Sequence, residues 1–314
     1  LEAAREIGKG QRPLIYPKGR RPAVLSDGWE ALDLPCGRCA GCRLEQSRQF
    51  AVRITHESAY LEEAHRLYSS FITLTYSEKC LPYGGTLVKH HLQDFFKRFR
   101  ARIAPRKIRY YASGEYGSTC PKHEIYDCPH CGPIQRPHYH AIVLGFDFPD
   151  RYYVCDREGE PVYRSDFLES LWQFGFHEIG SCTFQSAGYV ARYVMKKITG
   201  KKAQEHYTRY DPWTNTWFEV DPEFAIMSRR PGIGKVWLER YETDFYDNDE
   251  CPIPGRGVFG TPPRYYDKVM EEKYPEYLEE VKAQRKARMV QSLENGPSLE
   301  SRGKVQDADR KSTR

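Results

Sequence analysis

The pattern of hydrophobic and polar residues predicts short strands and amphipathic helices through the middle of the chain. Strands are expected where β-branched and aromatic residues concentrate, over 70–76 (SFITLTY), 108–113, 139–146 and 177–184. Apolar residues at helical spacing predict helices over 43–65, 86–103, 165–172 and 187–198. Residues that favour helix starts precede three of these helices, namely Thr86, Ser165 or Asp166, and Ser186.

From residue 70 to 198 the predicted order is strand, helix, strand, strand, helix, strand, helix. Each helix has one apolar face, as in 86–103, where Leu92, Phe95, Phe96 and Phe99 share a side. Such an order favours an antiparallel sheet with flanking helices, which is an α+β fold.

The segments outside this core differ in composition. Residues 1–33 are rich in Gly, Pro, Arg and Lys and are interpreted as an arm, and 200–221 as a polar loop or insertion. Residues 294–314 are polar, lack aromatic residues and are expected to be disordered. The predicted organisation is an arm (1–33), a catalytic domain (34–240, with an insert at 118–135), an extension with a helix (241–293) and the tail (294–314).

The composition suits a soluble, packed protein of 314 residues, with 39% hydrophobic and 29% charged residues. The mean hydropathy of −0.73 and the absence of a long apolar run argue against a membrane-spanning helix. No hydrophobic segment typical of a secretory signal is seen near the N-terminus. The short spacings among the ten cysteines favour metal binding or reduced thiols in a reducing cytoplasm.

The net charge of +5 is small, but basic residues concentrate between 87 and 112. Such a stripe suits a nucleic-acid phosphate backbone, and it is equally typical of a solvated helix face. The residues predicted to bind DNA here are Lys97, Arg98, Arg100, Arg102, Arg106 and Lys107.

Two histidines flank one tyrosine at the start of the apolar strand, as His138-Tyr139-His140. Alternation along a strand places both imidazoles on one face and Tyr139 on the other. Side-by-side imidazoles can chelate a divalent metal, although two hydrogen-bonded histidines at a strand edge would have the same spacing. Glu115, in a Gly-Glu-Tyr-Gly segment expected just after a strand, is a candidate third ligand or a solvent-exposed turn residue.

Tyr189 and Tyr193 are four residues apart in the last predicted helix and share one of its faces. Arg192 and Lys196 each follow a tyrosine by three residues, and Lys197 adds a further cation. Nearby cations can stabilise a phenolate and hold a phosphate, which suits a tyrosine nucleophile. An isolated pair at this spacing is more often an aromatic stripe that packs on the core.

Together these segments resemble the motif series of the HUH endonucleases, and in particular the replication initiation proteins of the Microviridae, such as the gokushoviruses. The resemblance covers about residues 34–240. It rests on PCGRCAGCR, SFITLTY, GEYG, RPHYHAIVLG, AGYVARYVMKK and SRRPGIG, which occur in this order.

The resemblance implies roles for individual residues. His138 and His140 match the metal-binding pair, with Glu115 as the third ligand. Tyr189 and Tyr193 match the paired nucleophiles, and Lys196 the lysine beside them, while Arg192 and Lys197 are predicted to contact DNA. The expected metal is Mg²⁺ or Mn²⁺.

The insert at 118–135 departs from the family pattern. Its Cys120, His123, Cys128 and Cys131 fit a tetrahedral structural zinc site, and a flexible loop with idle thiols is the alternative. Cys36, Cys39 and Cys42 supply only three ligands in sequence, so a zinc ion there needs a fourth from elsewhere, or else the three are packed or reduced thiols.

The function implied is rolling-circle initiation in the cytoplasm of an infected bacterial host. A tyrosine would nick single-stranded DNA at the origin, forming a 5′-phosphotyrosine and a free 3′-OH, and later rejoin the strand. The expected partners are origin DNA and the host replication helicase and polymerase, with no membrane. Alternatives are an HUH transposase or relaxase, and a non-catalytic zinc-containing protein that binds nucleic acid through Phe95, Phe96, Tyr110 and Tyr111.

Overall fold

The structure is a computed structural model with two compact units, residues 1–46 and residues 47–314. It describes residues 2–295 except 7–13, 17–21, 23, 25–26, 38, 118–135, 158, 194–196, 199, 212–213, 248 and 259. The expected disorder of 294–314 concerns residues that lie almost wholly outside the described ones.

The first unit contains a three-stranded antiparallel sheet in the order β2-β1-β3. Its strands are β1 (Glu2–Glu6), β2 (Leu14–Tyr16) and β3 (Trp29–Asp33). The sequence analysis assigned no strand to this segment, because the strands are short and lie among Gly, Pro and basic residues. The unit also contains the start of helix α1 (Ala40–His65).

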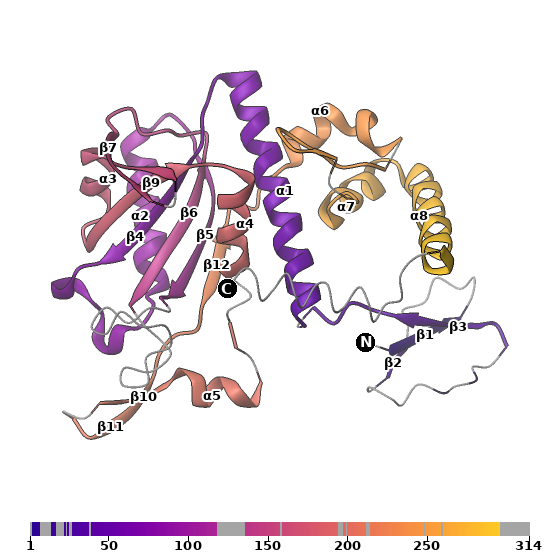
Figure 1. The fold of residues 1–314 in the computed structure, drawn as a ribbon, viewed down its shortest axis with the longest axis horizontal. Helices are drawn as coiled ribbons and strands as arrows, with labels where there is room; N and C mark the ends of the chain where they lie inside the picture. The colour runs from indigo at the N-terminus through magenta and orange to yellow at the C-terminus, as the bar shows by residue number, and fades with distance from the viewer. Residues whose placement is uncertain are drawn as a thin grey trace. The chain divides into compact units, whose positions relative to one another are not determined.

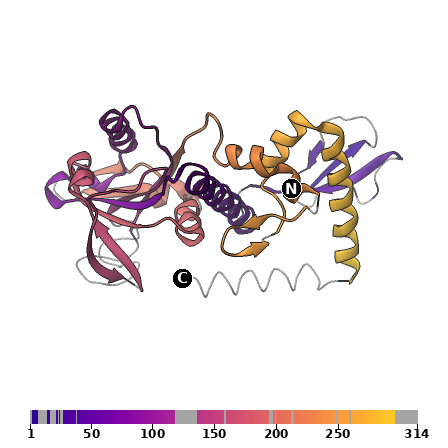
Figure 2. The same ribbon diagram turned by 90° about the horizontal axis from the view of Figure 1, so that it is seen from above.

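The second unit is built on a seven-stranded sheet in the order β12-β5-β6-β4-β9-β8-β7 (Figure 1). All the neighbouring strands in it are antiparallel. The strands are β4 (Ser70–Tyr76), β5 (Arg109–Tyr116), β6 (Pro137–Leu144), β7 (Tyr152–Arg157), β8 (Glu160–Arg164), β9 (Gly175–Ser181) and β12 (Phe224–Met227). The predicted α+β fold with an antiparallel sheet and flanking helices is confirmed. Strands β7, β8 and β12 were not predicted, and Figure 2 shows the β7–β8 hairpin standing away from the rest of the sheet.

Helices cover both faces of this sheet (Figure 1). On one face, α2 (Lys89–Ile103) and α3 (Asp166–Leu171) pack with Ile72, Leu74 and Tyr139 in the larger core. On the other face, α4 (Phe184–Arg192) and the part of α1 in this unit pack on Tyr111, Ile142 and Leu144. The two faces of one strand therefore serve two separate cores, as the period-2 alternation of strands requires.

Buried Tyr139 fixes the orientation of β6. Its hydroxyl lies 2.7 Å from the hydroxyl of Tyr76 and accepts a hydrogen bond from the Val88 amide at 2.8 Å. Because Tyr139 points into the α2 core, its neighbours His138 and His140 face the opposite side of the sheet.

The C-terminal part of the unit is mainly helical. It contains α6 (Lys235–Tyr246), α7 (Arg264–Lys273), α8 (Pro275–Asn295) and the short strands β13 (Pro252–Ile253) and β14 (Gly257–Val258). The predicted loop or insertion at 200–221 instead contains α5 (Lys201–Tyr207) and the hairpin of β10 (Thr208–Asp211) and β11 (Thr216–Glu219). Short 3₁₀ turns occur at η1 (Glu78–Cys80) and η2 (Tyr83–Gly85).

Three predicted boundaries were wrong for identifiable reasons. Helix α2 begins at Lys89, because the Thr86 hydroxyl accepts a hydrogen bond from the Asp221 amide instead of capping the helix. Helix α4 begins earlier than predicted, because Thr183 is its N-cap and Ser186 completes a capping box. Strand β5 extends to Tyr116, so Glu115 lies within the strand and not after it.

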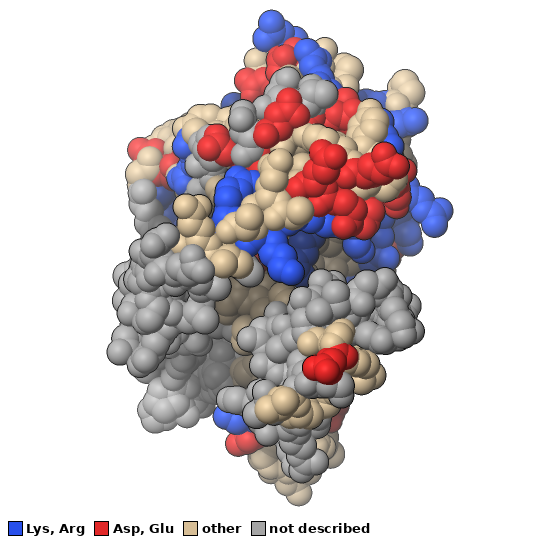
Figure 3. Space-filling model, turned by 90° about the vertical axis from the view of Figure 1, so that its right-hand side faces the viewer, with Lys and Arg blue, Asp and Glu red and all other residues tan. Residues whose placement is uncertain are grey.

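Charges on the C-terminal helices are largely paired with one another. Arg285 binds Asp249 and Asp267, and Lys273 binds Glu242. On the side of the molecule drawn in Figure 3, Lys and Arg side chains accordingly lie among Asp and Glu. None of the described helices combines the length and the apolar character that crossing a bilayer requires.

Candidate functional site

Polar side chains form two rows across four neighbouring strands, on the face opposite α2. Strand register aligns the residues of β5, β6, β4 and β9 in that order. The first row is Glu115, His138, Thr75 and Phe176, and the second is Ser113, His140, Thr73 and Glu178. The same face becomes apolar one row further along, where Phe71 and Ile142 meet α4 and α1.

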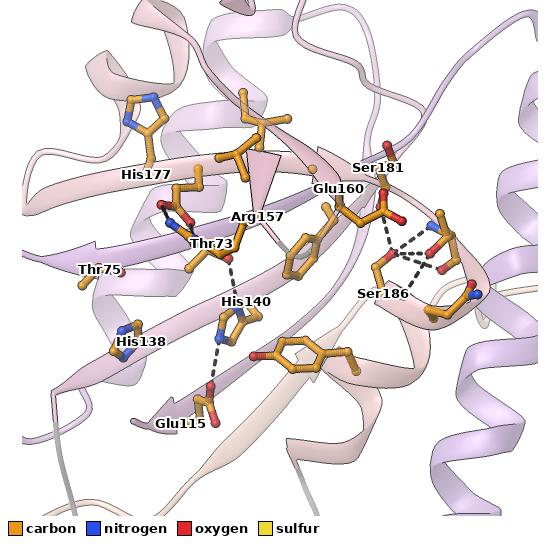
Figure 4. Close-up of a pocket in the computed structure, with 18 of the residues that line it drawn as sticks. Thr73, Thr75, Glu115, His138, His140, Arg157, Glu160, His177, Ser181 and Ser186 are labelled. Carbon is orange, nitrogen blue, oxygen red and sulfur yellow. Dashed lines mark hydrogen bonds and ion pairs between the residues drawn. The ribbon is translucent and has the colours of Figure 1, made fainter. Parts of the chain in front are cut away.

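His140 is held at both ring nitrogens (Figure 4). Its Nδ1 lies 3.0 Å from Thr73 Oγ1, and its Nε2 lies 2.9 Å from Glu115 Oε1. The carboxylate can only accept, which assigns the proton to Nε2 and makes Thr73 the donor to Nδ1. With 5% of its surface exposed, His140 is a fixed imidazole and not a mobile surface group.

The donor set of His138, His140 and Glu115 fits a divalent cation in chemistry and, in part, in geometry. The 2.9 Å between Glu115 Oε1 and His140 Nε2 matches the roughly 3 Å that separates neighbouring ligands in an octahedron with bonds of about 2.1 Å. His138 Nδ1 lies 2.6 Å from the Arg136 carbonyl, which leaves Nε2 as its ligand atom. The three donor atoms are not all within 4.8 Å of one another, so His138 must approach the pair to share one ion.

His138 is half-buried in the first row. Burial lowers its pKa, and the nearby His140 lowers it further, which outweighs the hydrogen bond with the Arg136 carbonyl that raises it. A lowered pKa keeps the imidazole neutral at physiological pH, and the neutral form is the one that binds metal.

The two predicted nucleophiles differ in exposure. Tyr189 is 43% exposed and meets His140 edge-on, with 5.3 Å between ring centroids. Tyr193, the C-cap of α4, is 4% exposed and stacks on His140 at 4.9 Å. Burial, and then the charge of Glu115, raises the pKa of Tyr193 far above its usual range.

These side chains line a cleft of about 800 Å³. Its floor is the two polar rows, and its walls come from α4 and from the β7–β8 hairpin. Arg157 of the hairpin binds Glu178 through both guanidinium nitrogens at 2.6 and 2.8 Å. His177 points away from His140 in Figure 4 and accepts a hydrogen bond from the Ser165 amide on the α3 side.

Comparisons with known proteins agree with this arrangement of motifs. The family model described as replication-associated protein ORF2 matches residues 69–198, which include both polar rows and both tyrosines. The chain is 32% identical over 251 residues to the replication-associated protein VP4 of Bdellovibrio phage phiMH2K, covering 77% of this chain and 69% of that protein. The chain belongs to the phage replication-associated proteins of the Microviridae.

Two further relatives support the same family. Replication-associated protein ORF2 of Spiroplasma virus 4 is 29% identical over 264 residues, which is 80% of this chain and 72% of that protein. Replication-associated protein ORF4 of Chlamydia phage 1 is 31% identical over 174 residues, which is 52% of this chain and 38% of that protein. No solved structure matches the chain.

In this replication-associated protein, the basic residues of α2 do not reach the cleft. The apolar side of α2 packs on the sheet face opposite the histidines, so its cations lie on the far side. Arg98 donates to the Leu171 carbonyl and Arg106 to the Gly145 carbonyl, while Lys97 pairs with Asp94. The exposed remainder is Arg100, Arg102 and Lys107. DNA binding by these six residues stays a prediction, and it concerns a different surface from the cleft.

Other predicted residues fall in different places. Arg192 lines the cleft, whereas the half-buried Lys197 is not among the lining residues. Lys196 lies outside the described residues, as do the predicted zinc ligands Cys120, His123, Cys128 and Cys131. Cys36, Cys39 and Cys42 form a group that could hold a metal ion, since their sulfur atoms all lie within 4.8 Å of one another.

Sequence reasoning missed Thr73, Phe176 and Glu178. The alternation of SFITLTY places Thr73 and Thr75 on one face, and this polar pair inside an apolar strand was a usable signal. The stacking residues of the non-catalytic alternative were wrong, because Phe95, Phe96 and Tyr111 are buried in the cores and Tyr110 stacks on Phe96.

Proposed function

We propose that this protein initiates rolling-circle replication by nicking single-stranded origin DNA with Tyr189 and later rejoining the strand. The observation that carries the proposal is the exposed Tyr189 beside His140, in a cleft that also holds His138 and Glu115. A phenol nucleophile, paired imidazoles and a carboxylate are the groups that tyrosine-mediated transesterification of a phosphodiester requires.

The phenolic oxygen of Tyr189 attacks the phosphorus, and the bond to the 3′ oxygen breaks. The products are a 5′-phosphotyrosine and a 3′ alkoxide, which takes up a proton to become the 3′-OH. Tyr189 must lose its own proton, and hydrogen bonds link Tyr189 to Tyr193 and Tyr193 to Glu115. These bonds give the proton a path to a buried carboxylate. Reversal of the attack by a 3′-OH reseals the DNA without ATP.

His138, His140 and Glu115 would hold Mg²⁺ or Mn²⁺, which supplies Lewis-acid polarisation of a phosphate oxygen when bound. Thr73 fixes the His140 ring through Nδ1, and this contact positions the metal-facing nitrogen.

Tyr193 is the second nucleophile of the proposal, and it acts in a different state of the site. Its hydroxyl is buried under His140 and beside Glu115, so attack by Tyr193 requires α4 to shift after Tyr189 has become linked to DNA. Alternating use of two tyrosines permits repeated rounds of cleavage and joining.

The cleft suits single-stranded DNA better than a duplex. Phe176 is 56% exposed in the first polar row and offers a ring face to a base, while Arg192 and Arg157 offer positive charge to phosphates. The DNA partner is the replication origin, and the released 3′-OH would prime synthesis by the host helicase and polymerase in the cytoplasm of the infected bacterium.

The test mixes the purified chain with labelled single-stranded DNA from its own replicon, with Mn²⁺ or with EDTA, on a denaturing gel. A metal-dependent, protease-sensitive protein–DNA band is expected, and Tyr189→Phe should remove most of it in a single turnover. Tyr193→Phe is the matched control, because it removes a hydroxyl four residues away and should retain the first adduct.

Two outcomes would reject the proposal in different ways. Cleavage that survives in the Tyr189→Phe, Tyr193→Phe double variant would indicate a hydrolytic nuclease with another nucleophile. Tight DNA binding without cleavage, across fragments that span the replicon, would indicate a non-catalytic binding protein.

A further inference from the structure

Three cysteines converge at the start of helix α1. The sulfur atoms of Cys36, Cys39 and Cys42 all lie within 4.8 Å of one another, and those of Cys36 and Cys42 are 3.9 Å apart. A disulfide requires about 2.05 Å between sulfurs, and none of the three cysteines is joined in one. The Cys39 amide also donates a hydrogen bond to Cys36 Sγ at 3.2 Å.

The sulfur spacing matches the geometry of one particular ion. Tetrahedral zinc holds thiolates at about 2.3 Å, which places neighbouring sulfurs about 3.8 Å apart. Among the described residues, this is the only His, Cys, Asp or Glu group whose ligand atoms converge so closely. Three thiolates at this spacing would repel one another strongly without a cation between them.

We propose that Cys36, Cys39 and Cys42 bind a structural zinc ion with their thiolates. The amide of Cys39 donates to a ligand sulfur and supports it in the charged form. Cys39 immediately precedes Ala40, the first residue of α1, so the positive end of the helix dipole also favours negative charge here.

The ion would stabilise a local connection that has little else to hold it. Cys36 follows the end of β3 at Asp33 by three residues, and Cys42 lies in the first turn of α1. One ion bound to both therefore ties the strand exit to the helix start. The first unit buries little apolar surface in its short strands, and small units of this kind commonly depend on metal ligation for stability.

The fourth ligand is a water molecule or a side chain outside the described residues. The zinc proposal does not depend on the tyrosine chemistry of the cleft, since no residue is shared. A failure of the nicking test therefore leaves the zinc proposal intact, and the converse also holds.

The first experiment measures protected thiols in the unaltered full chain. The protein is alkylated with iodoacetamide before and after addition of a zinc chelator, and modified peptides are identified by mass spectrometry. Cys36, Cys39 and Cys42 should react slowly at first and quickly after chelation, although Cys39 is exposed. Equal rates of reaction with and without chelator would overturn the proposal.

The second experiment measures metal content. Zinc per chain is determined by elemental mass spectrometry for the wild type, for a variant with Cys36, Cys39 and Cys42 all replaced by Ser, and for a Cys80→Ser, Cys155→Ser control. The triple variant should lose one equivalent relative to the wild type, and the control should lose none. Comparison of variants, and not the absolute content, allows for any zinc bound by the insert. Equal zinc in the wild type and the triple variant contradicts the assignment.

Discussion

Phe176 shows how a single exposed side chain can decide what the cleft binds. It aligns with Thr75, His138 and Glu115 across the sheet, yet its ring is 56% exposed where most aromatic residues of the unit are buried. Exposed apolar surface inside a polar cleft is unfavourable in water unless a ligand covers it. A nucleotide base next to the cleaved phosphate would supply that cover by stacking.

We expect Phe176→Ala to weaken binding of a short single-stranded oligonucleotide by about 5- to 100-fold, because stacking of one base on an aromatic ring contributes about 1–3 kcal/mol. Fluorescence anisotropy in EDTA measures this without cleavage. Phe176→Tyr keeps the ring and should bind as the wild type does. Tyr68→Ala removes an exposed ring outside the cleft lining and should also leave affinity unchanged. Wild-type affinity for Phe176→Ala would exclude the stacking role.

Strand β6 is the element that organises both the site and the core. Its inward-facing Tyr139 connects β4, α2 and β6 through hydrogen bonds, while His138 and His140 on either side of it form the catalytic rows. Burial raises the pKa of Tyr139 to about 12, so the phenol stays neutral and keeps its proton for the Tyr76 and Val88 contacts. The pitch of this strand thus couples core packing to the direction of the imidazoles.

Tyr139→Phe should therefore destabilise the fold while leaving the shape of the core unchanged. The Val88 amide and the Tyr76 hydroxyl would lose a buried partner, which costs about 1–3 kcal/mol. Urea unfolding followed by circular dichroism measures the change. Tyr68→Phe, at an exposed tyrosine, is the control and should fall within about 0.5 kcal/mol of the wild type. An equally small effect of Tyr139→Phe would show that these hydrogen bonds do not stabilise β6.

The elements that could be predicted from sequence are those with a regular pattern. Strand β4 was predicted with the correct ends, because its alternation serves two different environments on its two faces. The common face of His138 and His140 also followed from alternation alone. The hairpin β7–β8 carries mixed exposed residues, such as Tyr152 and Arg157, and has no apolar period to detect. The partners of His140 come from β4 and β5, and only the register of the sheet brings Thr73 and Glu115 to it.

At the scale of the whole unit, the segment SRRPGIG joins the sheet to the C-terminal helices. Arg53 of α1 donates to the Ile233 carbonyl at 2.8 Å, and Glu57 accepts from the Gly234 amide at 2.6 Å. Arg109 of β5 pairs with Glu57 and donates to the Pro231 carbonyl at 2.8 Å. Gly234 has a φ of 84° and lies against Tyr266, so a side chain there would be strained. This motif, which the sequence resemblance left without a role, holds the architecture together.

Buried His56 lies at the centre of the same junction. Its Nε2 donates to the Pro252 carbonyl at 2.6 Å, its Nδ1 accepts from the Tyr266 hydroxyl at 3.0 Å, and its ring stacks on Trp237 at 3.6 Å. Burial lowers its pKa to about 4, against the opposing effect of the Pro252 carbonyl. In the folded protein His56 is therefore neutral, with both nitrogens satisfied.

This lowered pKa makes the stability of the unit depend on pH. Between pH 6.5 and about 4 the unfolded chain binds a proton that folded His56 does not, so stability falls as pH decreases through this window. The loss attributable to His56 between pH 7 and pH 5 is about 2 kcal/mol. Above pH 7 both states are neutral and the contribution is constant.

His56→Gln should remove this dependence, because glutamine does not titrate. We expect the variant to be less stable than the wild type at pH 7 and the difference between them to shrink by about 2 kcal/mol at pH 5. The pKa values of His91, His138 and His177 are also lowered by burial, but these groups are common to both proteins and cancel in the comparison. Urea unfolding at a series of pH values measures the two curves. Parallel curves would mean that His56 is protonated alike in the folded and unfolded chains, and the junction would then not exclude water from its imidazole.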